Sequence, residues 1–139
     1  MLSNFKFHHT GIATNSIKNT SLYYLDAGYT MSDAIYDPIQ TVTIAFLEKN
    51  GMPRIELVEP GPSSSSDNSP IKKIIEKSGV SPYHICYEVD NIETAINELK
   101  SKKYIPLAKP VSAIAMKNRR ICFLYNKDVG LIELVEHTA

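Results

Sequence analysis

The chain has 139 residues, of which 43% are hydrophobic and 22% charged, and its 15 basic side chains are balanced by 15 acidic ones. A chain of this length fits one domain and buries about two-thirds of its unfolded surface. The even charge balance argues against a nucleic-acid or membrane-surface binder and favours a small-molecule partner. The N-terminal sequence predicts no signal peptide, and no stretch has the ~20 apolar residues that span a bilayer.

The two cysteines, Cys86 and Cys122, each lie in an apolar run that is typical of a strand. Their spacing matches no zinc or redox motif, which indicates buried thiols in a reducing compartment. We therefore expect a cytoplasmic protein.

The first half of the chain predicts a strand, a helix and then several strands. The strand carries the sequence FHHTGIA, and Ser16 can cap the helix that follows. This helix is weakly amphipathic, because Thr20 and Ser21 stand where apolar residues would be expected. The last two strands form a hairpin whose turn is Asn50-Gly51.

A Ser-rich segment from Gly61 to Pro70 separates the two halves and has little capacity to pack. We expect it to act as a linker that leads into a short helix over Pro70 to Ser78. Proline suits the first position of a helix, and Gly79 suits its C-terminal end.

The second half predicts the same order of elements. Tyr83 to Val89 is rich in aromatic and branched residues, as strands are. Either Asp90 or Asn91 can cap the next helix. Its apolar residues recur at helical spacing: Ile92, Ala95, Ile96 and Leu99. A looser loop, Asn126 to Gly130, joins the last two strands.

These halves are copies of one module of roughly 55 residues. FHHTGIATNSIKNTSLYYLDAGYT aligns with PYHICYEVDNIETAINELKSKKYI, which places His9 on His84. TIAFLEKNGMPRIELVEP aligns with RICFLYNKDVGLIELVEH, which places Phe46 on Phe123 and repeats the pentapeptide IELVE. We therefore expect one domain, 1–139, with module 1 at about 1–60, a linker and short helix at 61–79, and module 2 at about 80–139.

Strand alternation selects candidate site residues, because successive side chains point to opposite faces. One face of the strand 83–89 is bulky and suits packing beneath the helix: Tyr83, Ile85, Tyr87 and Val89. His84 therefore points the other way, and His9 occupies the matching place. By the same rule Glu56 and Glu133 point away from the helices. Each module thus offers one imidazole and one carboxylate to a cleft lined by both halves, the default ligand site.

Two imidazoles and two carboxylates suit a divalent Zn, Ni, Co, Mn or Fe ion. An octahedral ion would keep two positions open for water or substrate oxygens. Taken singly, a strand histidine is more often satisfied by hydrogen bonds and a strand glutamate more often faces water. The duplication of both residue types favours the metal site over these readings.

Other polar residues are weaker candidates for the metal site. His8 competes with His9, but it lies on the opposite face and has no counterpart, since Tyr83 stands there. Glu59 and Glu136 also repeat, yet they fall on the helix side and are expected to be solvated, and His137 is expected to belong to the tail.

The basic segment from Ala108 to Arg120 is a candidate lid or substrate loop. Lys117, Arg119 and Arg120 could bind the phosphates of a CoA or the carboxylates of a glutathione. A solvated basic loop is the alternative.

Four segments carry a family resemblance: HHTGIA, RIELVEP, SPIKKIIEKSGVSPYHICYEVDNIETAINELK and GLIELVE. They resemble the vicinal oxygen chelate superfamily (glyoxalase, bleomycin resistance and dioxygenase proteins), and nearest to them are glyoxalase I and methylmalonyl-CoA epimerase-like proteins. The resemblance implies an α+β fold in which paired βαβββ modules form a curved, barrel-like mixed sheet with helices outside. It also implies a homodimer and a metal held by His9, Glu56, His84 and Glu133.

The activity implied by the resemblance is proton movement next to a carbonyl, catalysed by a metal-dependent lyase or isomerase. We expect Glu133 to be the mobile base and Glu56 to be second. The epimerases carry a further glutamate in a Glu-x-Gly-Val pattern, where this chain has Ile39-Gln40-Thr41-Val42, and Asp37 is near but displaced.

The missing glutamate favours a glyoxalase I-like enzyme of the lactoylglutathione lyase type, which acts on a hemithioacetal. The first alternative is a methylmalonyl-CoA epimerase-like enzyme with an acyl-CoA thioester substrate. The second is a metal-free protein that binds a small molecule such as a drug.

Overall fold

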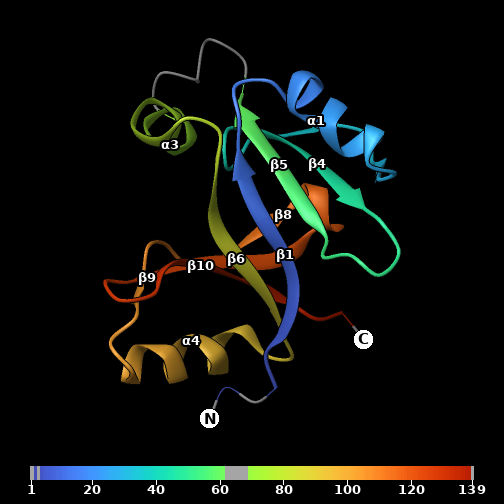
Figure 1. The fold of residues 1–139 in the computed structure, drawn as a ribbon. Helices are drawn as coiled ribbons and strands as arrows, with labels where there is room; N and C mark the ends of the chain where they lie inside the picture. Colours follow the sequence, from blue (N-terminus) through green and yellow to red (C-terminus); the bar gives the residue numbers. More distant parts are fainter. Residues whose placement is uncertain (1, 3, 62–68, 139) are drawn as a thin grey trace. The chain divides into compact units, whose positions relative to one another are not determined.

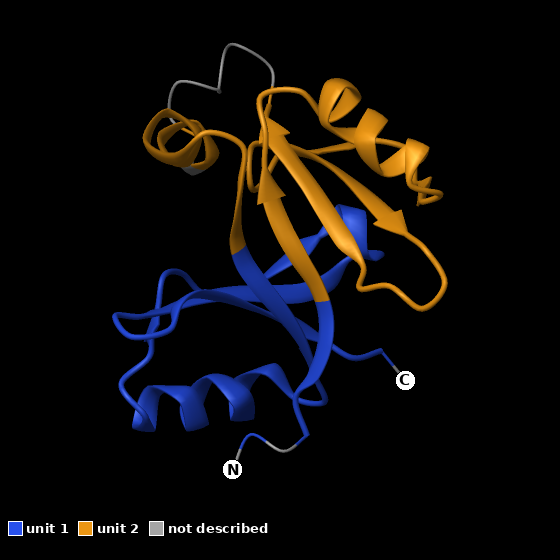
Figure 2. Ribbon diagram, viewed as in Figure 1, with its two compact units in different colours: residues 1–8, 84–139 blue, residues 9–83 orange. Residues whose placement is uncertain are grey.

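The computed structural model describes residues 2, 4–61 and 69–138. Most of the expected Ser-rich linker, 62–68, therefore lies outside the described residues. The chain divides into two compact units: unit 1 consists of Met1–His8 and His84–Ala139, and unit 2 of His9–Tyr83 (Figure 2). The division falls inside the first strand of each module, whereas the sequence predicted module borders near residues 60 and 80. The assignment of the whole chain to one domain stays a prediction.

Unit 2 contains the first module from His9 onward and the helix that follows it, whose elements are labelled in Figure 1. Its elements in chain order are β1 (Lys6–Ala13, in this unit from His9 onward), α1 (Ile17–Asp26), β2 (Thr30–Met31), β3 (Ile35–Asp37), β4 (Val42–Glu48), β5 (Ile55–Pro60) and α3 (Pro70–Ser78). The strand order is β2-β4-β5-β1, and β3 also pairs with β4. β1 runs parallel to β5, and the other pairs are antiparallel.

Unit 1 contains the second module. Its elements are β6 (Ser81–Val89, in this unit from His84 onward), α4 (Ile92–Ser101), β7 (Ile105–Pro106), β8 (Val111–Ala113), the 3₁₀ turn η1 (Ile114–Met116), β9 (Arg119–Asn126) and β10 (Gly130–Glu136). The strand order is β6-β10-β9-β7, and β8 also pairs with β9. Here too the first strand of the module, β6, runs parallel to the last, β10.

Both modules therefore contain a strand, a helix, short strands and a final hairpin, in a mixed sheet. This confirms the predicted α+β fold built from two βαβββ modules. The joining of the modules into one curved surface stays a prediction. Among the described residues, no helix combines the length and the apolar character needed to cross a bilayer.

The helices begin where their capping residues predict. The Ser16 hydroxyl accepts a hydrogen bond of 3.1 Å from the Asn19 N–H at the start of α1. Of the two candidates for α4, Asn91 is the cap, and its side-chain oxygen accepts a 2.9 Å bond from the Thr94 N–H. α3 spans the predicted residues and ends at Gly79, whose φ of 68° favours glycine.

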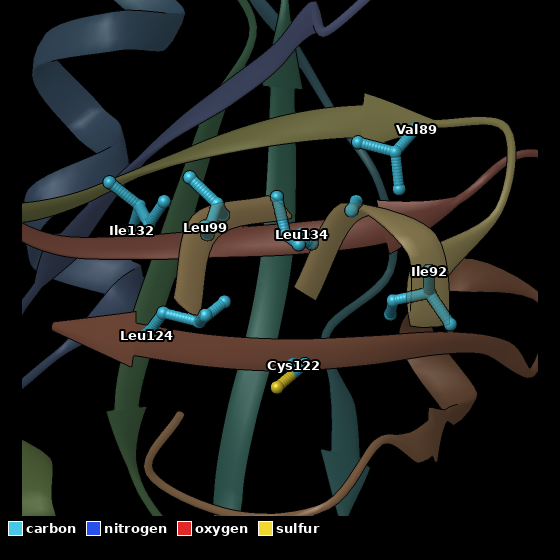
Figure 3. Packing of buried hydrophobic residues seen from close by; sticks show 8 residues of the cluster. Val89, Ile92, Leu99, Cys122, Leu124, Ile132 and Leu134 are labelled. Atoms are coloured by element: carbon cyan, nitrogen blue, oxygen red, sulfur yellow. The ribbon is translucent and has the colours of Figure 1, made fainter. Parts of the chain in front are cut away.

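α1 and α4 each pack against the strands of their own module. In unit 1 the core contains Val89, Ile92, Ala95, Leu99, Cys122, Leu124, Ile132 and Leu134 (Figure 3). Leu2 and Phe5, from the N-terminal segment of the same unit, pack against it. In unit 2 the corresponding core contains Ile12, Ile17, Ala45, Leu47 and Leu57. Each such large side chain stabilises the fold by about 1.5–3 kcal/mol when fully buried.

One residue departs from the predicted bulky face of β6. Tyr87 and Val89 contact the core of unit 1 as expected, but Ile85 is 41% exposed. The reason is length, because the ten residues of α4 extend about 15 Å whereas the nine of β6 extend about 30 Å. The helix therefore covers only the Val89 end of the strand.

We expect Asn91→Ala to lower the free energy of unfolding by about 1 kcal/mol, because the first turn of α4 loses its side-chain acceptor. Urea denaturation followed by circular dichroism measures this change. Asp90→Ala is the matched control and should have little effect, so equal losses in both variants would contradict the assignment of the cap.

Candidate functional site

In unit 2, a histidine and a glutamate lie side by side on the parallel strands β1 and β5. Glu56 is opposite Gly11 in the strand register, two residues from His9 on the same face. The Nε2 atom of His9 lies 3.4 Å from Oε1 of Glu56. The two residues are 0% and 2% exposed. The ring of Phe46 on β4, opposite Glu56 in register, meets the imidazole edge-on at a centroid distance of 5.4 Å.

Unit 1 repeats this arrangement on β6 and β10. Glu133 is opposite Cys86, again two residues from the histidine, His84. The Nε2 atom of His84 lies 3.1 Å from Oε1 of Glu133, and the residues are 4% and 2% exposed. Phe123, opposite Glu133 on β9, meets the imidazole edge-on at 5.1 Å. The two modules thus hold the same three side chains in the same strand register.

The structure brings together the predicted residues of each module and adds one aromatic residue to each. Strand alternation identified the histidines and glutamates, but gave no role to Phe46 and Phe123. The repeat contained the signal, because the two phenylalanines align with each other. An aromatic edge against an imidazole restricts the ring and excludes water beside it. A carboxylate in such a place needs a compensating positive charge, since burying it alone is costly.

Both cysteines are buried thiols, as the sequence predicts. Burial raises the pKa of the Cys122 thiol, and the Glu133 carboxylate raises it further. Cys122 therefore stays protonated and acts as a small hydrophobic residue.

Part of the basic segment 108–120 is hydrogen-bonded to the sheet as a strand. β8 pairs with β9, with Val111 opposite Ile121, and Met116 in η1 is buried. Lys117 is exposed and has a left-handed backbone, with φ of 56°. A substrate role for this segment stays a prediction.

The two predicted substrate arginines are engaged by carboxylates. Arg119 binds Glu88, with 2.5 Å between Nη1 and Oε2. Its Nη2 lies 3.0 Å from Nε2 of His8, the neighbour of His9 on β1. Arg120 binds Glu93 and Glu136, and these contacts raise the pKa of its guanidinium.

Two C-terminal residues make contacts that the sequence does not predict. Glu136 was expected to be solvated, but it accepts hydrogen bonds from Arg120 and from the Ile92 N–H at the start of α4, and these bonds lower its pKa. His137 was expected to be tail. Its N–H instead donates to the Val89 carbonyl at 2.7 Å, and its Nδ1 lies 3.2 Å from a carboxylate oxygen of Glu88. Glu59, the module 1 counterpart of Glu136, is half-buried.

Asp37 holds a turn. Its carboxylate is 1% exposed and accepts three hydrogen bonds, from the N–H groups of Ile39 and Gln40 and from the Gln40 side-chain amide, at 2.8–3.1 Å. Thr41 follows in a left-handed conformation with φ of 58°, at the place of glycine in the Glu-x-Gly-Val pattern. Ile39, at the place of the glutamate, is 61% exposed. Asp37 therefore serves as the acceptor that shapes the β3–β4 turn.

Comparison with known proteins gives consistent matches. The family model of the Glyoxalase/Bleomycin resistance protein/Dioxygenase superfamily matches residues 8–123. The mitochondrial methylmalonyl-CoA epimerase of Homo sapiens is 32% identical over 133 residues, which cover 93% of this chain and 72% of that protein. An ethylmalonyl-CoA/methylmalonyl-CoA epimerase of Cereibacter sphaeroides is 28% identical, over 93% of this chain and 96% of that protein.

Solved structures of similar fold include a protein named for the same activity as these relatives. The crystal structure of methylmalonyl-CoA epimerase from Mycobacterium tuberculosis superposes with a TM-score of 0.81 at 26% identity, covering 96% of this chain and 89% of that one. A hypothetical protein from Bacillus halodurans superposes with a TM-score of 0.83 at 33% identity, covering 97% and 96% of the two chains.

We expect Asp37→Ala to lower the free energy of unfolding by about 1–3 kcal/mol, because it leaves the donors of the turn without their acceptor. Asp37→Asn keeps an acceptor oxygen and should lose much less, and Asp33→Ala, at an exposed position, should be nearly neutral. Chemical denaturation of the three variants measures these differences. Equal losses for the alanine and asparagine variants at position 37 would show that the charge matters rather than the hydrogen bonds.

Proposed function

Because the chain belongs to the Glyoxalase/Bleomycin resistance protein/Dioxygenase superfamily, we propose that it is a metal-dependent isomerase acting on an acyl-CoA thioester, in the manner of methylmalonyl-CoA epimerase. The observation that carries this proposal is the 32% identity to the human epimerase along 93% of the chain. It favours the epimerase alternative over the glyoxalase I-like activity that the missing glutamate predicts, for which the comparisons give support only at the level of the superfamily.

We further propose that His9, Glu56, His84 and Glu133 bind one divalent metal ion, Ni, Co, Zn or Mn. The donors fit such an ion, because imidazole nitrogens and carboxylate oxygens are ligands of all four metals. Each module supplies one buried carboxylate beside one buried imidazole, and a cation would compensate the cost of burying both carboxylates. When bound, the metal would stabilise the negative charge that develops on a substrate carbonyl.

The two glutamates would transfer the proton. Epimerisation removes the proton on the carbon next to the thioester carbonyl from one face and returns a proton to the other face. We assign Glu133 as the carboxylate that moves the proton and Glu56 as the second acid–base group. The two carboxylates hold equivalent strand positions in the two modules, which supports a pair of acid–base groups.

A glyoxalase I-like activity is the second candidate, and one observation favours it. Ile39 stands where the epimerases have a glutamate, and Asp37 is held as an acceptor within its turn. Moving a proton between adjacent carbons of a hemithioacetal requires one carboxylate, whereas epimerisation requires a group on each face.

We also infer a homodimer in the cytoplasm with a small-molecule substrate. The family resemblance supports the dimer, and the two buried thiols support a reducing compartment. Lys117, exposed between η1 and β9, is a candidate to bind phosphates of the substrate, and Arg119 and Arg120 would do so only by exchanging carboxylate partners.

We expect methylmalonyl-CoA to be epimerised by the protein loaded with Co²⁺ and not by protein stripped with a chelator. Loss of the α-proton in D₂O, followed by NMR, measures turnover. Binding of Co²⁺ should also raise Tm, with about 2.7 kcal/mol of stabilisation when free metal is 100 times its Kd.

The outcomes of this assay separate the candidates. Turnover of the glutathione hemithioacetal but not of methylmalonyl-CoA would replace the epimerase with the second candidate. A protein that binds none of the four metals and turns over neither substrate would be a metal-free binding protein.

We expect Glu133→Gln to reduce kcat by about 10²–10⁴-fold while leaving the fold intact, because an amide cannot accept the proton. Glu59→Gln, a glutamate at the end of β5 outside the proposed site, is the matched control and should keep normal turnover. Steady-state kinetics with circular dichroism distinguish chemistry from misfolding. Retained activity in Glu133→Gln would remove the role assigned to this carboxylate.

A further inference from the structure

Two neighbouring arginines of β9 bind carboxylates in different parts of unit 1. Arg119 contacts Glu88 on β6, and both side chains are largely buried, at 15% and 24% exposure. Arg120 contacts Glu93 on α4 and Glu136 at the end of β10. Since successive residues of a strand point to opposite faces, the two arginines serve opposite sides of the sheet.

Strand alternation places the Arg119–Glu88 pair on the face that carries the proposed metal ligands. Glu88 lies four residues after His84 on β6. Arg119 lies four residues before Phe123, whose ring packs on His84. Both spacings preserve the face. The Arg120 contacts instead lie on the side of α4, where Glu136 also accepts the Ile92 N–H.

A fully buried layer separates the ion pair from the His84–Glu133 pair. It consists of Cys86, Ile121 and Val135, one residue from each of the three strands, at 0–1% exposure. In the strand register Val135 is opposite Glu88 and Ile121, whereas Cys86 is opposite Glu133, so the layer crosses the three strands diagonally between the two pairs. A displacement at the Glu88 end of β6 would therefore be transmitted to His84 through close-packed side chains.

We propose that Arg119, acting through Glu88, is a positioning residue that sets the geometry of the His84–Glu133 pair. This inference rests on the proposed metal site. The distance between these two side chains depends on the register of β6 against β10, a parallel pair with slanted backbone hydrogen bonds. The ion pair joins β9 to β6, which lie on either side of β10, and therefore spans the middle strand.

Contacts of His137 with β6 strengthen the link that the Arg119–Glu88 ion pair makes between the strands. His137, directly after β10, donates its N–H to the Val89 carbonyl and places Nδ1 3.2 Å from Glu88. Burial alone would raise the pKa of Glu88, but hydrogen bonds from Arg119 and His137 outweigh it and lower the pKa. Glu88 therefore stays ionised at neutral pH, and the ion pair with Arg119 persists.

The test is the affinity for Co²⁺, titrated by its visible absorption, in the full-length protein. We expect Arg119→Met to weaken Co²⁺ binding about 10-fold, the size of effect found when groups that orient metal ligands are removed. Glu88→Gln should weaken binding to a similar extent, and the double variant no more than either single one, because the two residues act as one unit. Arg119→Lys should restore part of the affinity.

Arg120→Met is the matched control, because it removes an ion-paired arginine from the neighbouring position on the other face. It should lower Tm but leave Co²⁺ affinity unchanged. Equal loss of affinity in the Arg119 and Arg120 variants, or unchanged affinity in both Arg119→Met and Glu88→Gln, would overturn the proposal. Failure of the wild-type protein to bind Co²⁺ would instead overturn the metal site itself.

Discussion

The parallel pairing of the first and last strands of each module is the constraint on which the candidate site depends. It sets Glu56 beside Gly11 and Glu133 beside Cys86, in each case two residues from the histidine. A shift of one residue in either pair would turn the carboxylate to the helix side. Each module thus holds one imidazole and one carboxylate of the proposed ligand set by its own strand pairing, and a bound metal would stabilise both modules.

The register also explains why the local site is so similar in two halves of different sequence. The residues that pack beneath the helices fix which face is buried, and the IELVE segments carry those residues and the glutamate together. The phenylalanine follows from the hairpin, because antiparallel pairing sets Phe46 opposite Glu56 and Phe123 opposite Glu133. Three side chains are therefore positioned by two strand pairings, which explains why the duplication preserves them as a set.

Local signals in the sequence sufficed for the helices, the hairpins and the His–Glu pairs. Capping residues, turn glycines and strand alternation act over a few positions, and the repeat identified which alternating residues matter. Contacts between distant residues could not be predicted in this way. Arg119 meets Glu88 and His8, 31 and 111 positions away, and its sequence context resembles a solvated loop. Ile85 was misplaced because alternation says which way a side chain points but not how far the helix reaches.

The borders of the two compact units do not coincide with the borders of the two modules, so a cut between the modules divides a unit. Residues 1–8 belong to the unit of the second module, where Leu2 and Phe5 pack on its core and the Phe5 and Tyr87 rings lie 6.2 Å apart. A fragment cut at the Ser-rich segment would therefore leave the C-terminal half with an uncovered hydrophobic surface. Part of the first strand of each module belongs to the compact unit of the other module, so neither module by itself contains all the residues of one unit.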